Sequence, residues 1–284
     1  MSNKHYYFRF SSLVFSLLLA NAGVAHSQSH FVPENQKRLL TNSNGLQLAD
    51  IPEPSTNIAT GTRLVRPMNQ ILQDGVNFKP SSNPQPKNTS PAGTRGGVCD
   101  QDIYSESSSA LSMIPLVPEV KSGYTIAERP TLLLYVPQTS AQQIILIISE
   151  NNEQGEKLHS QTFFSIQDNP GIVALQPSQE SPSLTVGKTY QMAAVLICGE
   201  KPGPNDPAVL TRIQRLQFNN SFEKANELQK ADWYATQGIW YDAIDSLATY
   251  KVNSPIAQNA DHIWFNLLDS IGLSQITEMP IYSE

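Results

Sequence analysis

The feature that most limits the possible folds is a change of hydrophobic period near residue 219. Before it, short apolar runs recur at intervals of roughly ten residues and are separated by turn residues. After it, apolar residues recur three and four positions apart, as they do on one face of a helix. A run of strands followed by a run of helices predicts an α+β chain with its β-structure first.

Six segments carry the strand pattern. They are 131–136, 143–149, 158–166, 171–175, 189–198 and 210–218. The polar loop that ends in Gly155 suits a hairpin, so the second and third runs should be antiparallel neighbours. The fifth run is apolar on both faces, which predicts a central strand. We expect two packed antiparallel sheets, an immunoglobulin-like β-sandwich over 98–218.

Three helices are expected over 219–284. The first opens at a capping box of Asn220 and Glu223 and ends at Gly238, and the third ends at Gly272. The spacing of small and large residues in the first two resembles one tetratricopeptide hairpin, and the third helix would cap it. Such a hairpin cannot bury its faces alone, so it must pack on the third helix, on the sandwich or on a partner.

The N-terminal 27 residues have the layout of a secretory signal. Lys4 and Arg9 give a positive start, and a largely apolar run of 16 residues, 10–25, follows. That run is shorter than the ~20 residues of a membrane-spanning helix. We expect cleavage near Ser27, export to the periplasm or the outside of the cell, and no membrane span in the mature chain.

Residues 28–97 are rich in Asn, Ser, Thr, Gln and Pro, and their apolar residues are sparse. This composition predicts a disordered linker. An alternative is that the apolar residues of 68–72 form a short helix or a docking segment.

The charge balance excludes two classes of partner. The formal net charge of −6 becomes −8 when Lys4 and Arg9 leave with the signal. Nucleic acid needs a basic face, and an anionic membrane surface needs a basic cluster, yet the basic residues here are few and scattered. We therefore expect no nucleic-acid partner.

The two cysteines, Cys99 and Cys198, are expected to form a disulfide because an exported chain meets oxidising conditions. Two free, buried thiols are the alternative. Two isolated cysteines without histidines at ligand spacing cannot fill a tetrahedral zinc site, so we assign no metal and no cofactor.

All three tryptophans lie in the expected helices, where they either pack in the core or line an aromatic groove for a partner such as another envelope protein. The candidate interaction residues are Trp233, Tyr234, Trp240, Tyr241 and Asp242.

Titratable residues also gather there. They are Asp232, Asp242, Asp245, Asp261 and His262. Helical spacing puts most of them on solvated faces, so we assign no catalytic residue. The alternative is an envelope-polymer hydrolase built around Asp242. It needs a pocket that joins this carboxylate to Asp245, Arg212 or His159.

Several short motifs resemble one family. They are RGGVC at 95–99, ERPT at 128–131, YVP at 135–137, LIC at 196–198, WYATQGIWYDA at 233–243 and WFNLLDSIGL at 264–273. Together they resemble the domain-of-unknown-function family numbered 928, exported proteins found chiefly in cyanobacteria, over residues 92–282. The resemblance implies a periplasmic or outer-envelope location and a two-part architecture. It carries no activity, ligand or catalytic residue to this chain.

The sequence therefore predicts four parts: a signal (1–27), a disordered linker (28–97), a β-sandwich (98–218) and a helical unit (219–284). Its predicted function is that of an exported, non-catalytic binding or protein-interaction module of the cell envelope. A hydrolase and a structural envelope component are the alternatives.

Overall fold

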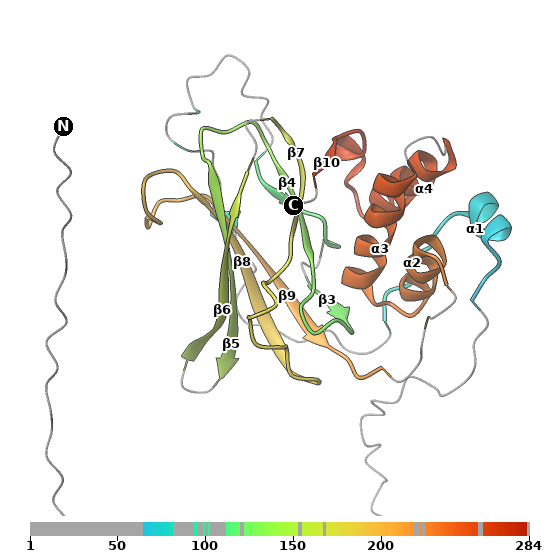
Figure 1. Ribbon diagram of the computed structural model, residues 1–284, viewed down its shortest axis with the longest axis horizontal. Helices are drawn as coiled ribbons and strands as arrows, with labels where there is room; N and C mark the ends of the chain where they lie inside the picture. Colours follow the sequence, from blue (N-terminus) through green and yellow to red (C-terminus); the bar gives the residue numbers. More distant parts are fainter. Residues whose placement is uncertain are drawn as a thin grey trace, which may run out of the picture. The chain divides into compact units, whose positions relative to one another are not determined.

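Two mixed β-sheets followed by helices form the described part of the chain (Figure 1). The computed structural model describes residues 65–81, 94–95, 99, 102, 112–119, 122–152, 155–166, 169–218, 222, 225–254 and 258–282. The expected signal and most of the expected linker lie outside these residues. None of the helices in the described ranges is long and apolar enough to cross a membrane.

The larger sheet has six strands in the order β1-β9-β8-β5-β6, with β3 also paired to β9. Its strands are β1 (Thr94–Arg95), β3 (Ser122–Thr125), β5 (Gln143–Asn152), β6 (Gly155–Ser165), β8 (Thr189–Ile197) and β9 (Ala208–Arg215). The smaller sheet has the order β10-β7-β4-β2. Its strands are β2 (Ile114–Pro115), β4 (Leu132–Val136), β7 (Gly171–Leu175) and β10 (Ile281–Tyr282).

The predicted hairpin and the predicted central strand are both confirmed. β5 and β6 pair antiparallel from Gln143 opposite Ser165 to Asn152 opposite Gly155, with a bulge beside Ile148. β8 lies between β5 and β9. The expectation of purely antiparallel sheets is wrong, because β3 pairs parallel with β9 and β10 parallel with β7. Each of these short strands is far from its partner in the sequence. The local alternation of residues does not show whether such a distant pair is parallel or antiparallel.

One hydrophobic core joins the sheets to the helices. It contains buried side chains of β4, β5, β8 and β9 together with those of the C-terminal helices. All five residues of β4 are buried, which explains its unbroken apolar run, Leu132–Val136. Figure 1 shows the C-terminal helices on the side of β3, β4 and β7, away from β5 and β6. The predicted domain boundary near residue 219 stays a prediction, although the core crosses it.

Four helices are described: α1 (Met68–Asp74), α2 (Glu227–Thr236), α3 (Trp240–Asn253) and α4 (Gln258–Asp269). The capping box of α2 consists of Asn226 and Gln229, whereas the predicted box of Asn220 and Glu223 lies outside the described residues. The Asn226 side chain accepts a hydrogen bond from the Gln229 N–H, and the Gln229 side chain accepts one from the Asn226 N–H. Two backbone donors that the helix leaves unpaired are thus satisfied together.

Gly238 ends α2, as predicted, and allows α3 to begin two residues later. Its φ of +75° is a conformation that favours glycine. A Cβ atom at this position would also lie 2.8 Å from the Ser81 backbone nitrogen. The turn between α2 and α3 therefore needs glycine for its own geometry and for the close approach of the 79–81 segment.

The first turn of α3 is tied to three parts of the β-structure, and we call Trp240, Tyr241 and Asp242 the α3 anchor. The Trp240 indole N–H donates to the Leu116 carbonyl at 2.8 Å, and the Tyr241 hydroxyl donates to the Arg212 carbonyl at 3.0 Å. The Asp242 carboxylate accepts a hydrogen bond at 3.2 Å from the N–H of Ile126, the residue after β3. The anchor orients α3 against both sheets.

Gly123 in β3 makes room for the α3 anchor. A Cβ atom at Gly123 would lie 3.0 Å from the Tyr241 ring and 3.3 Å from the Trp240 Cβ. The helix can therefore lie directly on the strand backbone, which brings the Tyr241 hydroxyl within reach of β9.

The prediction of a disordered linker is wrong for residues 65–81, where the alternative of a docked helix is what forms. Ile71 of α1 is fully buried, and the Lys79 N–H donates to the Ala235 carbonyl at 3.0 Å. The Arg66 guanidinium forms a bidentate pair with Asp232, a carboxylate that is only 2% exposed. The sequence gives no local sign of this partnership, because the two residues are 166 positions apart.

We expect Tyr241→Phe to lower the free energy of unfolding by about 1 kcal/mol, because it removes one buried hydrogen bond and keeps the ring. Urea unfolding followed by circular dichroism measures the change. Tyr250→Phe is the matched control, since Tyr250 is on the same helix and its hydroxyl has no hydrogen-bond partner in the described chain. Equal stability of the two variants would contradict the anchoring role.

Candidate binding site

A disulfide joins Cys99 to Cys198, as the sequence predicts. Cys198 follows the last residue of β8, and Cys99 comes shortly after β1, which pairs with β9. The bond therefore fixes the end of a central strand to a segment 99 positions earlier in the chain.

Asp102 extends the attachment to a second loop. Its N–H donates to the Cys99 carbonyl at 2.8 Å, so the two residues form one turn. Its carboxylate accepts hydrogen bonds from the Thr139 hydroxyl at 2.6 Å and from the Ser140 N–H at 2.8 Å. Burial raises the pKa of Asp102, but these bonds outweigh it and leave the pKa below its ordinary value. Asp102 therefore holds the β4–β5 loop as a carboxylate.

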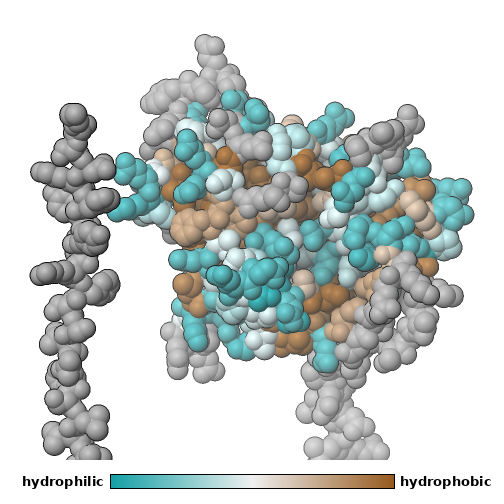
Figure 2. Space-filling model, in the orientation of Figure 1, coloured by the Kyte–Doolittle hydropathy of each residue, from teal (hydrophilic) through white to brown (hydrophobic). Residues whose placement is uncertain are grey.

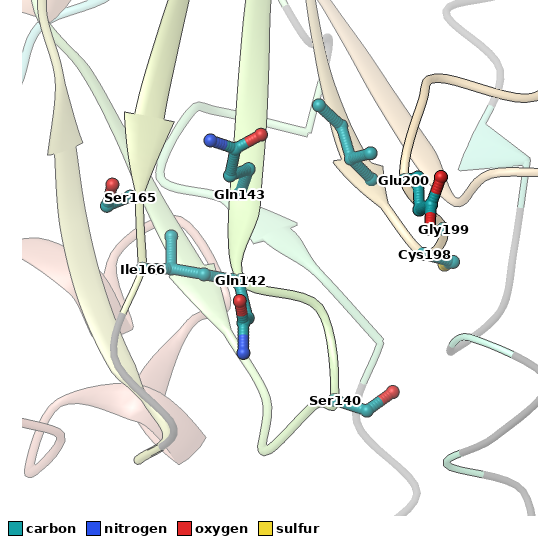
Figure 3. A pocket seen from close by; sticks show the side chains of 9 residues that line it. Ser140, Gln142, Gln143, Ser165, Ile166, Cys198, Gly199 and Glu200 are labelled. Carbon is teal, nitrogen blue, oxygen red and sulfur yellow. The ribbon is translucent and has the colours of Figure 1, made fainter. Parts of the chain in front are cut away.

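We call Cys99 and Asp102 the clamp, because they hold the two walls of an open groove at the strand ends. The groove has a volume of about 660 Å³. It is lined by Ser140, Gln142, Gln143, Ser165, Ile166, Ile197, Cys198, Gly199 and Glu200. Figure 3 shows Ser165 and Ile166 on one side, Cys198 to Glu200 on the other, and the two glutamines between them.

The groove offers hydrogen-bonding side chains beside an apolar wall. Two carboxamides, two hydroxyls and one carboxylate are among the nine lining residues, and none of the nine is cationic. Ile166, Ile197 and the disulfide supply the apolar part. No histidine is among the described lining residues beside Ser140 and Ser165.

An apolar sheet face continues from the groove. Ser165 and Gln143 form one row of the face, and Phe163 and Ile145 form the next row along the same strands. Phe163 is 50% exposed, and Leu158 further along β6 is 56% exposed. Ile145 is buried but is outside the core that the sheets share with the helices, so it belongs to this opposite face. Figure 2 shows apolar surface, in tan and brown, along the side where β5 and β6 lie.

The acidic residues of the helices are not in this groove. The expectation that most of them are solvated is wrong for Asp232, which pairs with Arg66, and for Asp242 and Asp245, whose pKa values are raised by burial. Asp261 and His262 are exposed, as predicted.

Asp242 has a structural role in the α3 anchor. Its carboxylate accepts a hydrogen bond from the Ile126 N–H at 3.2 Å and another from the Thr125 side chain. Asp245 lies close enough to raise the pKa of Asp242 further. The pair is therefore half-buried between α3 and the β-structure, where Asp242 holds the backbone that follows β3.

The hydrolase interpretation required a pocket that joins Asp242 to Asp245, Arg212 or His159. The groove at the strand ends includes none of these residues. His159 lies on β6 with its Nε2 atom 3.0 Å from the Pro182 carbonyl, and its ring packs on Tyr190.

The candidate interaction residues lie on the helical side of the molecule. Trp240 and Tyr241 are fully buried, and Trp233 and Tyr234 are buried with small exposed fractions. Trp233 and Tyr234 pack edge-on against Phe222. Core packing accounts for the four aromatic residues, and no open surface is left at Trp240 or Tyr241.

Apart from the two cysteines, the sequence analysis did not identify the residues of the groove and of the clamp. A local signal does exist, because Cys99 and Asp102 have the spacing of a single turn and Gln142-Gln143 places two amides directly before an apolar run. Glu200 likewise follows the second cysteine by two positions. Polar residues at strand ends beside a disulfide are therefore a local pattern that indicates such a groove.

Metal chemistry finds no support in the same ranges. No group of three or more histidine, cysteine or acidic side chains that could hold a metal ion occurs among the described residues.

The fold and the groove define a two-sheet α+β module with a preformed surface site. The chain belongs to the family described as Domain of Unknown Function (DUF928), whose profile matches residues 90–281. The match includes the clamp, both sheets and the α3 anchor. No curated protein and no solved structure is found to be similar to the chain.

The burial of Asp242 predicts a pH dependence of stability. Burial raises its pKa to about 6 in the folded protein, whereas an aspartate of an unfolded chain titrates near about 4. The folded state therefore takes up the proton first as the pH falls, and the free energy of unfolding should decrease as the pH rises from about 4 to about 6. Above about pH 6 this contribution should level off.

Asp242→Asn removes the titrating group and so isolates its contribution. Between about pH 5 and about pH 7, wild type should lose about 1 kcal/mol of unfolding free energy relative to the variant. Urea unfolding of both proteins across this range measures the difference. The same pH dependence in both proteins would exclude Asp242 as its source.

The disulfide should contribute strongly to stability because it closes a loop of 99 positions. Replacing both Cys99 and Cys198 by Ser should lower the free energy of unfolding by about 4–5 kcal/mol, from the chain entropy that the bond removes from the unfolded state. Denaturant unfolding measures this, and wild type in reductant should match the variant. A loss below about 1 kcal/mol would show that the fold holds the clamp without the bond.

Proposed function

We propose that this protein is an exported, non-catalytic binding module of the cell envelope, and that the groove is its binding site. The observation that carries the proposal is the clamp. The disulfide holds the wall at Cys198, and the buried carboxylate of Asp102 holds the wall at Ser140 of the same open groove. A site with fixed walls binds without first ordering its loops, so less free energy is lost on association.

Two observations support export. The first 27 residues have the layout of a secretory signal. The folded domain contains a disulfide, and such bonds persist in the periplasm and outside the cell but are rare in the cytosol. Both observations point to one compartment, and the partner would then be another component of the envelope.

The finer architecture is part of the proposal. We infer that the sheets form an immunoglobulin-like sandwich and that α2 and α3 act as one tetratricopeptide-like hairpin capped by α4. In support, a tight turn at Gly238 joins α2 to α3, and the hairpin buries its faces against the sheets, as a lone unit must. Both scaffolds commonly serve recognition, although a fold by itself does not define a function.

The hydrolase alternative is weaker because Asp242, the carboxylate on which it depends, already holds the backbone after β3. Asp242 accepts hydrogen bonds from Thr125 and Ile126 in the α3 anchor, and the groove does not include it. A raised pKa at a residue that holds backbone in place is a consequence of burial. A purely structural role would leave the clamped groove unexplained.

Export and partner binding can be tested in the native cells. We expect the protein in the envelope or medium, with a mature N-terminus near Ser27 and no alkylatable thiol under non-reducing conditions. A photo-crosslinking residue at Gln143 in the groove should form a discrete adduct with an envelope component. The same residue at Val252, which is exposed on α3, should not. An uncut cytosolic product, or equal labelling from both positions, would overturn the proposal.

A further inference from the structure

We propose that the groove binds a neutral glycan segment, with Phe163 as an apolar platform beside the hydrogen-bonding groups. The inference rests on the proposed function, because it names the ligand class of the same site. Four features of the described residues support it: the chemistry of the lining, the paired backbone beneath it, the exposed ring next to it and the fixed loop above it.

The lining matches a ligand that both donates and accepts hydrogen bonds without carrying charge. Carboxamides and hydroxyls each do both, as sugar hydroxyls do, and the groove supplies two of each. The described lining has no Lys or Arg to bind an anion, and Glu200 is its one carboxylate. A single carboxylate is too few for a divalent cation, which takes several oxygen ligands.

The backbone beneath the groove is already paired, which separates a glycan from an extended peptide. Gln143 is paired on both sides, with Ser165 of β6 and with Ile197 of β8. A peptide that adds to a sheet needs a free row of backbone N–H and C=O groups, and the centre of the groove has none to offer. At the centre of the groove recognition therefore comes from side chains, which suits a ligand with hydroxyls along its whole length.

Phe163 provides the apolar surface that a sugar ring needs. It lies on the same sheet face as Ser165, two residues earlier on β6, so the two rows are about 7 Å apart. Its ring is half exposed and lies opposite Ile145, so an apolar surface is open to a ligand at this row of the sheet. One sugar ring can lie over Phe163 while its neighbour enters the groove, whose 660 Å³ is the size of a small-molecule site.

The clamp fixes the polar side of the same site. Asp102 holds the Ser140 backbone, so the loop that borders the groove is set by a buried carboxylate. On the opposite wall, the disulfide holds Cys198, two residues before Glu200. Weakly binding ligands such as neutral glycans gain most from a preorganised site, because each hydrogen bond contributes little.

Calorimetric titration of the mature chain tests the inference. The probes are cellohexaose, maltohexaose and the hexamer of N-acetylglucosamine as neutral glycans, and a hexamer of guluronate as an anionic one. We expect saturable binding of at least one neutral probe and none of the anionic probe. Gln143→Ala and Phe163→Ala should each weaken that binding about tenfold, which corresponds to about 1.4 kcal/mol.

Matched controls come from the same strand. Gln161→Ala removes a carboxamide from the same face outside the groove, and Leu158→Ala removes an exposed apolar side chain beyond the bulge. Both should change the affinity by less than about twofold. Thermal unfolding checks that all four variants are folded. We expect that they are, because the four replaced side chains are exposed.

Three results would overturn the inference: no neutral probe binds at millimolar concentration, the anionic probe binds as well as the neutral ones, or the control variants lose as much affinity as the groove variants. The crosslinking experiment separates these failures from failure of the proposed function. A protein adduct from Gln143 without any glycan binding would leave the binding module in place and make its ligand a polypeptide.

Discussion

The attachment of the first turn of α3 to the β-structure is the interaction on which the rest of the fold depends. Three consecutive side chains, Trp240 to Asp242, reach backbone groups next to β2, at β9 and after β3. Each bond replaces one that water would otherwise make with a buried polar group, so losing any of them leaves that group unsatisfied. The direction of α3 then sets where α2 lies, and the segment of residues 65–81 packs on α2. Packing therefore explains residues 238–243, which belong to one of the motifs that resemble the family.

This attachment divides the molecule into two sides with different physical character. On the helical side, Trp240 and Tyr241 are buried and hydrogen-bonded, and the pair of Arg66 with Asp232 neutralises a charge that burial alone would disfavour. On the other side, the polar ends of β5, β6 and β8 border a groove next to an exposed Phe163. Side chains that contribute little to stability are available for recognition, and those that line the groove lie on this second side.

The sequence patterns predicted the features that depend on residues close together in the chain. The alternation and the turn at Gly155 were enough for the β5–β6 hairpin, and the two apolar faces of β8 were enough for its central place. β3 was missed because Ser122–Thr125 has no alternation, and its burial comes from β9 and α3, far along the chain. The burial of Asp242 was missed for the same reason, since its hydrogen-bond partners are 116 or more positions away. The groove depends on several loops meeting, and no single window of sequence contains that information.

The clamp shows that the groove forms only when segments far apart in the sequence come together. The two walls of the groove belong to the loop after β4 and to the turn after β8, and both continue from one end of the β5–β8 ladder, where Gln143 lies opposite Ile197. The turn formed by Cys99 and Asp102 joins them, by a covalent bond on one side and by a carboxylate on the other. An apolar residue at position 102 could fill the same space but would leave the Ser140 N–H without this acceptor. The geometry of the groove is thus coupled to the oxidised state of the cysteines.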